Sequence, residues 1–355
     1  MTAIDQRQQA KRNAEAANTG FRRATEALRR IGARRAQTFA ALLVLVVVFA
    51  VWAVVDGGTK LLLQRTFDGL TNGFIYSAMA LSLVLIYRST GIINFAQGNM
   101  AMFGTFIAYV LIVEQGLSVW IGVLLAMIFS AAGAATIERL FVWPFDPKNH
   151  LAITIVTLAW YLILAALAGI IWAFDPRAFP SPFPTSAEDF VQIGGARIRY
   201  ASLGMWVTIL VTLVLLTQLL RRTRIGLAFR AVSSNLDSSR LVGIRIGRVV
   251  QLGWALSAAM GTLAGCLIAP NLLLDPNFMS KVLIFSFAAA TLGGLDSLGG
   301  AVVGGLIIGL VQTMSGGYFK VIGSEFALAS ALVVIIVILL VRPSGLFGSR
   351  RVERV

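Results

Sequence analysis

Long apolar runs separated by short polar segments dominate the chain. The runs lie near 39–55, 67–87, 91–113, 118–138, 151–173, 203–220, 250–270, 299–317 and 326–341, with a shorter one at 282–294. About 20 apolar residues in a helix span the roughly 30 Å of hydrocarbon in a bilayer, and somewhat fewer suffice inside a bundle. The pattern predicts an all-α polytopic membrane protein in which 282–294 either crosses the membrane or re-enters it.

Basic residues give these segments an orientation. Arginines gather before the first run, between 221 and 248, and in the tail 343–355, and all three segments are predicted to be cytoplasmic. If both termini are cytoplasmic, the chain must cross the membrane an even number of times. Counting 282–294 as a crossing gives about ten. A transmembrane permease domain would then occupy 39–342, with an extracytoplasmic loop rich in proline and polar residues at 175–202.

Composition supports the membrane assignment and narrows the chemistry. Hydrophobic residues make up 57% of the chain and charged residues 13%, with a mean hydropathy of +0.82. The net charge of +14 does not indicate a nucleic-acid partner, because the arginines fall at the ends of apolar runs. Cys266 has no cysteine partner for a disulfide, and His150, the one histidine, is interpreted as a loop residue.

The first 38 residues differ from the rest of the chain. They hold nine basic residues against three acidic ones and few large apolar side chains. A secretory signal, with a short basic region and a cleavage site after its apolar core, does not fit this pattern. We expect a cytoplasmic arm, either partly helical over Gly20–Ala36 and lying on anionic lipid, or solvated and disordered.

Two apolar stretches are interrupted by polar residues and glycine. The first, TGIINFAQGNMAMFG, runs from Thr90 to Gly104, and the second, GGLDSLGG, runs from Gly293 to Gly300. Interrupted segments in the two halves of a transporter indicate internal, inverted repeats that meet at a central pathway. The predicted path residues are Asn94, Gln97, Asn99, Asp296 and Ser297. The alternative is structural: amides that bond between helices, and small residues that let helices approach closely.

The sequence lacks the motifs of several other functions. Charged residues are nearly absent from the middle of the spans, which argues against proton- or sodium-coupled transport. There is no GxxxxGK[ST] loop for a nucleotide, and no HExxH, GxSxG or buried aspartate pair for catalysis. The chain is therefore predicted to be neither an enzyme nor an ATPase.

Several motifs in order resemble a known family. NGFIYSAMALSLVLIYRSTGIINFAQGNMAMFG (Asn72–Gly104), the stretch Arg222–Pro270 and AAATLGGLDSLGGAVVGGLIIG resemble the LivH-type permease subunit of branched-chain amino acid ABC importers, over about 67–345. The resemblance implies a subunit of a bacterial inner or plasma membrane, paired with a second, LivM-like permease, two cytoplasmic ATPases and an extracytoplasmic binding protein. It also implies that no cofactor binds directly, since ATP is used by the partner subunits.

The resemblance places the contact with an ATPase in AVSSNLDSSRLVGI, residues 231–244, as a coupling helix. The residues it implies are Asn235, Asp237, Arg240, Leu241, Gly243 and Ile244. A short amphipathic cytoplasmic segment between spans is suited to transmit ATPase closure as rigid-body motion. An ordinary basic loop is the alternative interpretation.

The chain departs from the family at two places that bear on the substrate. Family members usually carry NFAHGE where this chain has NFAQGN, so that Gln97 and Asn99 replace a histidine and a glutamate, and Gly299 stands where proline is frequent. The expected cargo is a branched-chain amino acid or a related small solute. A passive channel for a small neutral solute such as urea or an amide is the rival, although it would have no use for a docking segment at 221–248.

Overall fold

The structure is a computed structural model that describes residues 55, 58–145, 149–186, 188–318, 326–342 and 345–348. The chain divides into the units Met1–Leu62 and Leu63–Val355, and the contacts below lie within the second. The predicted arm 1–38, nearly all of the run 39–55 and most of the tail 343–355 lie outside the described residues.

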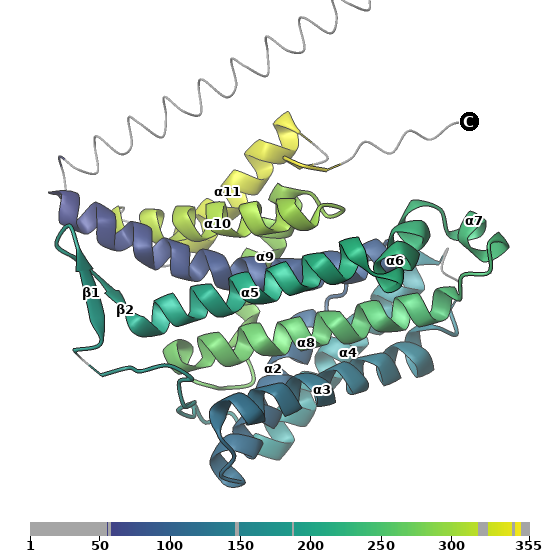
Figure 1. Ribbon diagram of the computed structural model, residues 1–355, viewed down its shortest axis with the longest axis horizontal. Coiled ribbons are helices and arrows are strands. Elements are labelled where there is room, and N and C mark those ends of the chain that lie inside the picture. Colours follow the sequence, from purple (N-terminus) through teal and green to yellow (C-terminus); the bar gives the residue numbers. More distant parts are fainter. Residues whose placement is uncertain are drawn as a thin grey trace, which may run out of the picture. The chain divides into compact units, whose positions relative to one another are not determined.

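Helices make up most of the described chain (Figure 1). After a helix at Gly58–Thr90 come α2 (Gln97–Tyr109) with a π-turn at Val110–Glu114, α3 (Val119–Ile137) with a π-turn at Glu138–Val142, α4 (His150–Trp172), β1 (Phe190–Ile193), β2 (Ala196–Arg199), α5 (Tyr200–Arg222), α6 (Arg224–Ser234), α7 (Leu236–Leu241), α8 (Ile246–Leu272), α9 (Met279–Gly293), α10 (Leu298–Tyr318) and α11 (Phe326–Val341).

Six helices of the described ranges are long and apolar enough to cross a membrane. They are Gly58–Thr90, Val119–Val142, His150–Trp172, Tyr200–Arg222, Ile246–Leu272 and Leu298–Tyr318. At 15 residues, α9 is about 22 Å long, which is short of a full hydrocarbon span. The structure thus supports a multi-pass, mostly helical protein, and the count of about ten crossings stays a prediction.

Burial separates central from peripheral helices. The most apolar windows of Gly58–Thr90 and of α8 are 83% and 78% buried, whereas those of α3 and α4 are only 22% buried. The peripheral helices turn large apolar side chains outward, among them Ile128, Leu162 and Ile170. Exposed apolar surface on this scale is unfavourable in water and suits contact with lipid.

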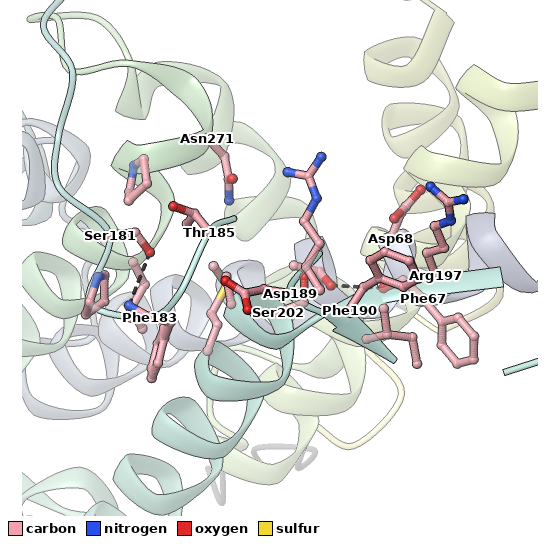
Figure 2. A pocket seen from close by; sticks show the side chains of 18 of the residues that line it. Phe67, Asp68, Ser181, Phe183, Thr185, Asp189, Phe190, Arg197, Ser202 and Asn271 are labelled. Carbon is pink, nitrogen blue, oxygen red and sulfur yellow. Dashed lines mark hydrogen bonds between the residues drawn. The ribbon is translucent and has the colours of Figure 1, made fainter. Parts of the chain in front are cut away.

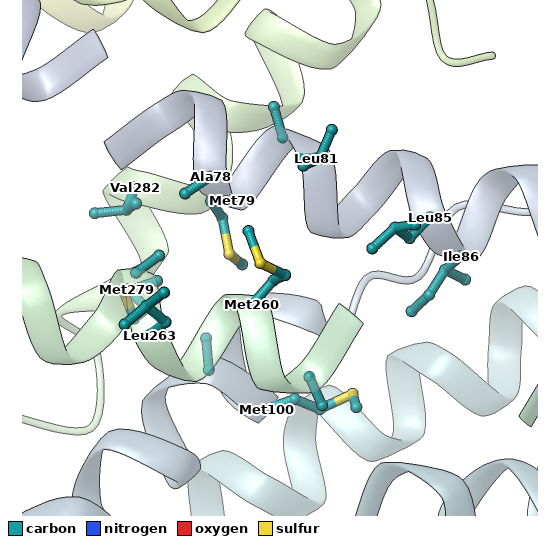
Figure 3. Close-up of a cluster of buried hydrophobic side chains, with 14 of the residues drawn as sticks. Ala78, Met79, Leu81, Leu85, Ile86, Met100, Met260, Leu263, Met279 and Val282 are labelled. Atoms are coloured by element: carbon teal, nitrogen blue, oxygen red, sulfur yellow. The ribbon is translucent and has the colours of Figure 1, made fainter. Parts of the chain in front are cut away.

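The core lies where the central helices meet (Figure 3). Met79 of the first helix, Met260 of α8 and Met279 of α9 are almost completely buried, with Met100 of α2 close to the same region. Methionine is flexible and fills irregular gaps between helices. This core therefore joins elements from both halves of the chain.

Glycines bring the first helix and α10 into backbone contact. A Cβ atom at Gly309 would lie 2.3 Å from the amide nitrogen of Gly73, and one at Gly305 would lie 2.3 Å from the Ser77 hydroxyl. The Ser77 hydroxyl lies 2.8 Å from the carbonyl oxygen of Val302 and 2.7 Å from that of Gly73, so it donates to one of these acceptors. The close packing predicted from the glycine spacing is confirmed for this pair of helices.

Both predicted interruptions are present. The first helix ends at Thr90 and α2 begins at Gln97, with irregular backbone over 91–96. The second is a tight turn between Gly293 and Leu298, in which the Ser297 hydroxyl accepts a hydrogen bond from the amide of Gly300 at 3.0 Å. Glycine with a positive φ at Gly91 and Gly294 makes both turns possible.

The loop 175–202 adds a small strand element to an otherwise helical chain, consistent with the all-α class that the sequence predicts. It contains a two-stranded antiparallel hairpin in which Phe190 pairs with Arg199 and Ile193 with Ala196. Gly194 and Gly195, both with positive φ, form the two-residue turn that such hairpins favour. The hairpin leads directly into α5, whose far end, at Arg222, is followed by α6. Hairpin and α6 therefore lie at opposite ends of α5 (Figure 1).

Candidate functional site

The Gln97 side chain is completely buried at the first residue of α2. Its Nε2 donates to the carbonyl oxygen of Ser257 in α8 at 3.0 Å. The Ser257 hydroxyl lies 2.9 Å from Gln97 Oε1 and 2.7 Å from the carbonyl oxygen of Ser82 in the first helix, so it donates to one of these acceptors. The amide thus joins α2 to α8, beside the first helix.

The two asparagines are also buried and bonded within the chain. Asn94 Oδ1 accepts from the amide of Ala96 at 3.0 Å and so stabilises the turn before α2. Asn99 Nδ2 donates to the carbonyl oxygen of Tyr161 in α4. These contacts fit the structural alternative for the three amides. Their role in lining a path stays a prediction.

Replacing Gln97 with leucine distinguishes the two roles. If the amide lines the path, we expect Gln97→Leu to lower solute uptake several-fold while the complex still assembles, since leucine offers a passing solute no hydrogen bond. Ser257→Ala is the matched variant because it removes the hydroxyl next to the Gln97 amide, and with it one interhelical hydrogen bond worth about 1 kcal/mol, but leaves the amide itself in place. Uptake and detergent stability are measured for both variants. An equal loss of both properties in the two variants would leave only the structural role.

A large cavity opens beside the hairpin (Figure 2). Its volume is about 1180 Å³, and its walls come from the first turns of the helix Gly58–Thr90, the segment 179–202, the start of α5 and the end of α8. Figure 2 shows Asp68 and Arg197 toward one end, with Ser181, Thr185 and Asn271 toward the other. Polar residues from distant parts of the sequence thus face one space.

Gln64 fastens the hairpin to the cavity wall. Its side chain accepts from the amide of Arg197 at 2.8 Å and donates to the carbonyl oxygen of the same residue at 3.0 Å. The same Nε2 lies 3.1 Å from Asp68 Oδ1, one helical turn further on. The paired amide contact fixes β2 against the helix. It also brings Arg197 and Asp68 to the same wall.

Asp296 and Ser297 line a second, smaller cavity of about 360 Å³. Arg88, Arg221 and Arg230 border the same space, and Arg88 lies within electrostatic range of Asp296 and Arg230. Leu220 and Arg221 place this cavity at the α6 end of α5. The five predicted path residues therefore do not form one site: the three amides lie in the helical core, and Asp296 and Ser297 lie at this second cavity.

The predicted coupling helix 231–244 is divided. α6 ends at Ser234, Asn235 adopts an extended backbone, and α7 begins at Leu236. The Asn235 side chain accepts from the amide of Ser238 at 2.9 Å, which is the capping contact that starts a new helix. The prediction that residues 231–244 form one helix was therefore wrong.

The end of the divided segment presents apolar and basic side chains. Leu241 is 89% exposed, Arg240 is exposed, and Gly243 turns the chain with φ +80°. Ile244 packs against the core instead, and the side chain of Asp237 lies outside the described residues. Contact of these residues with an ATPase stays a prediction.

A family comparison assigns the chain. The profile of the family described as "Branched-chain amino acid transport system / permease component" matches residues 65–341, which include all the described elements from α2 to α11. The chain belongs to this permease family. As a member of it, the protein is a transport subunit and not an enzyme.

Named relatives cover most of this permease. "High-affinity branched-chain amino acid transport system permease protein LivH" of Salmonella typhimurium (strain LT2) is 29% identical over 82% of this chain and 97% of its own length. BraD of Pseudomonas aeruginosa, also named as a high-affinity branched-chain amino acid permease protein, is 29% identical over 82% of this chain and 98% of its own. The solved structure of PsaBC from Streptococcus pneumoniae in complex with Fab is 14% identical over 84% of this chain at a TM-score of 0.43, too slight a likeness to support an argument.

Sequence reasoning missed the charged residues of the large cavity of this permease. Asp68, Asp189, Arg197 and Arg199 were not among the predicted site residues, although the last three lie in the loop 175–202, which was predicted to be extracytoplasmic. The available signal was the turn Gly194-Gly195 between alternating residues, which predicts a hairpin and hence that Arg197 and Arg199 share one strand face.

Proposed function

We propose that this permease is the membrane subunit of an ATP-driven importer that carries a branched-chain amino acid or a related small solute. The observation that carries the proposal is the family match over 65–341. LivH and BraD, over nearly their full lengths, support the substrate class through their names. These names do not favour the alternative of a passive channel.

The proposed assembly contains a second permease, two cytoplasmic ATPases and an extracytoplasmic binding protein, in a bacterial inner membrane with both termini of this chain inside. Energy would enter from the partners, because the sequence lacks a phosphate-binding loop. The exposed Leu241 and Arg240 of α7 support an ATPase contact at one end of α5, and the large cavity supports solute entry at the other.

Mild extraction tests the assembly. A C-terminally tagged chain, isolated from its own membrane, is expected to carry a second permease and two ATPases that mass spectrometry identifies. Membrane vesicles with the complete importer and its binding protein are expected to accumulate radiolabelled leucine only when ATP is supplied. A chain that purifies alone, or leucine entry that is independent of ATP, would contradict the importer and support a facilitator.

A further inference from the structure

The large cavity carries charges of both signs in balance. Among the described residues that line it, Asp68 and Asp189 face Arg197 and Arg199, and these four formal charges sum to zero. A cavity for an anion or a cation alone would show an excess of one sign, because like charges in one site repel and opposite charges attract the ligand. The balance points to a ligand that is itself neutral overall but charged at both ends.

The basic side of the cavity is held in place before any ligand binds. The amide and the carbonyl oxygen of Arg197 are both hydrogen-bonded to the Gln64 side chain. The Arg197 guanidinium lies over the ring of Phe190, 4.7 Å from the ring centroid. A ring contact of this kind uses no hydrogen bond, and the five N–H groups of a guanidinium can donate to a carboxylate. Arg199 lies two residues further along the same strand and so on the same face. Together they suit a carboxylate.

The acidic side is also positioned. Asp189 stands directly before β1, and its Oδ2 accepts from the amide of Ser186 at 2.9 Å, which fixes the carboxylate at the cavity wall. Asp68 is held from the helix by the contact with Gln64 at 3.1 Å. The two oxygens of a carboxylate can accept several hydrogen bonds, so one such contact leaves acceptor capacity unused. An ammonium group would satisfy that remaining capacity.

An apolar surface lies within the same cavity. It is formed by Phe179, Met205 and Leu267, each of which is at most 5% exposed. The charged residues are more accessible: Asp68 and Asp189 are half-buried, and both arginines are exposed. A ligand with a charged head and a hydrocarbon side chain would place the head at the accessible charges and the chain against this apolar wall.

We infer that the cavity is a transit site for a free, zwitterionic apolar amino acid, with Arg197 and Arg199 at its carboxylate and Asp68 and Asp189 at its ammonium group. The inference rests on the proposed function, to which it adds the form of the solute and the residues that receive it. The rival occupant of this cavity is a loop of the binding protein, and the experiment below distinguishes the two.

Cysteine protection tests the site without relying on transport. Ser202 lines the cavity, and the chain's own Cys266 is buried, so Ser202→Cys supplies a single reactive thiol there for an impermeant maleimide. The reaction is followed on the complete importer in right-side-out vesicles without binding protein. The probes are leucine, isoamylamine, which lacks the carboxylate, and 4-methylpentanoate, which lacks the amine. Leucine at ten times its dissociation constant is expected to slow labelling about tenfold.

Charge variants complete the test. In the Ser202→Cys background, Asp68→Asn and Arg199→Gln are expected to raise the leucine concentration for half-protection several-fold. Glu188→Gln and Lys281→Gln are the matched controls, because both residues are exposed and neither lines the cavity. They are expected to leave protection unchanged.

Each contrary outcome is distinct. Equal protection by leucine and its two single-charge analogues, or protection that the charge variants do not alter, would overturn the inference. Protection by the unloaded binding protein but not by leucine would assign the cavity to that protein and overturn it as well. If vesicles accumulate leucine while leucine gives no protection, only the inference fails. If they accumulate no branched-chain amino acid, the proposed function fails.

Discussion

Gly309→Ala is expected to destabilise the permease by about 3 kcal/mol and to abolish uptake. A methyl group at this position would lie 2.3 Å from the amide nitrogen of Gly73, 2.4 Å from its Cα and 2.5 Å from the carbonyl oxygen of Gly69. All three are backbone atoms, which cannot rotate away as a side chain would. The first helix and α10 would have to separate, and the contacts on both sides of the seam would be lost.

Gly299→Ala is the matched control in the same helix. Outside its own helix backbone, no atom of the described residues lies within 4 Å of a Cβ at Gly299, so the added methyl meets open space. Fluorescence-detected size exclusion after heating in detergent compares the two variants. We expect the apparent melting temperature of Gly309→Ala to fall by about 10 °C and that of Gly299→Ala to stay near the parent value. Equal stability of the two variants would show that the seam does not depend on the missing side chains.

The helical part of the fold could be predicted because its signals are local. Apolar runs marked the helices α3, α4, α5, α8 and α10, and glycine with polar residues marked the breaks at 91–96 and 294–297. The first helix was predicted over 67–87 but extends over Gly58–Thr90. Its added first turns carry Gln64, which lies outside the predicted apolar run and bonds to the hairpin.

The large cavity could not be predicted because its residues are far apart in the chain. Gln64 and Arg197 are separated by 133 positions, and no local pattern links them. Their contact depends on where the short hairpin packs, and the turn Gly194-Gly195, which predicts the hairpin, does not show which helix it meets. The division of the coupling segment had a local signal that was missed, since asparagine is favoured at the start of a helix and Asn235 caps α7.

Leu241→Asp is expected to reduce uptake at least about tenfold while leaving the permease stable. Leu241 is 89% exposed and Val242 is 75% exposed at the end of α7, so a charge there costs little in the isolated subunit. If α7 docks on an ATPase as proposed, the leucine becomes buried on assembly, and a central apolar contact of this kind contributes about 2 kcal/mol or more. An unpaired carboxylate in that interface adds a desolvation cost.

The matched variant for this position is Leu241→Met, which keeps an apolar side chain of similar volume and is expected to retain uptake. Co-purification of the ATPases with the tagged chain and ATP-dependent leucine uptake are measured for both variants. Loss of both properties in Leu241→Asp alone places the energy input at α7. Retained ATPase binding with unchanged uptake would instead make the exposed end of α7 an ordinary surface loop, and the link between the ATPases and this permease would have to lie elsewhere along 221–248.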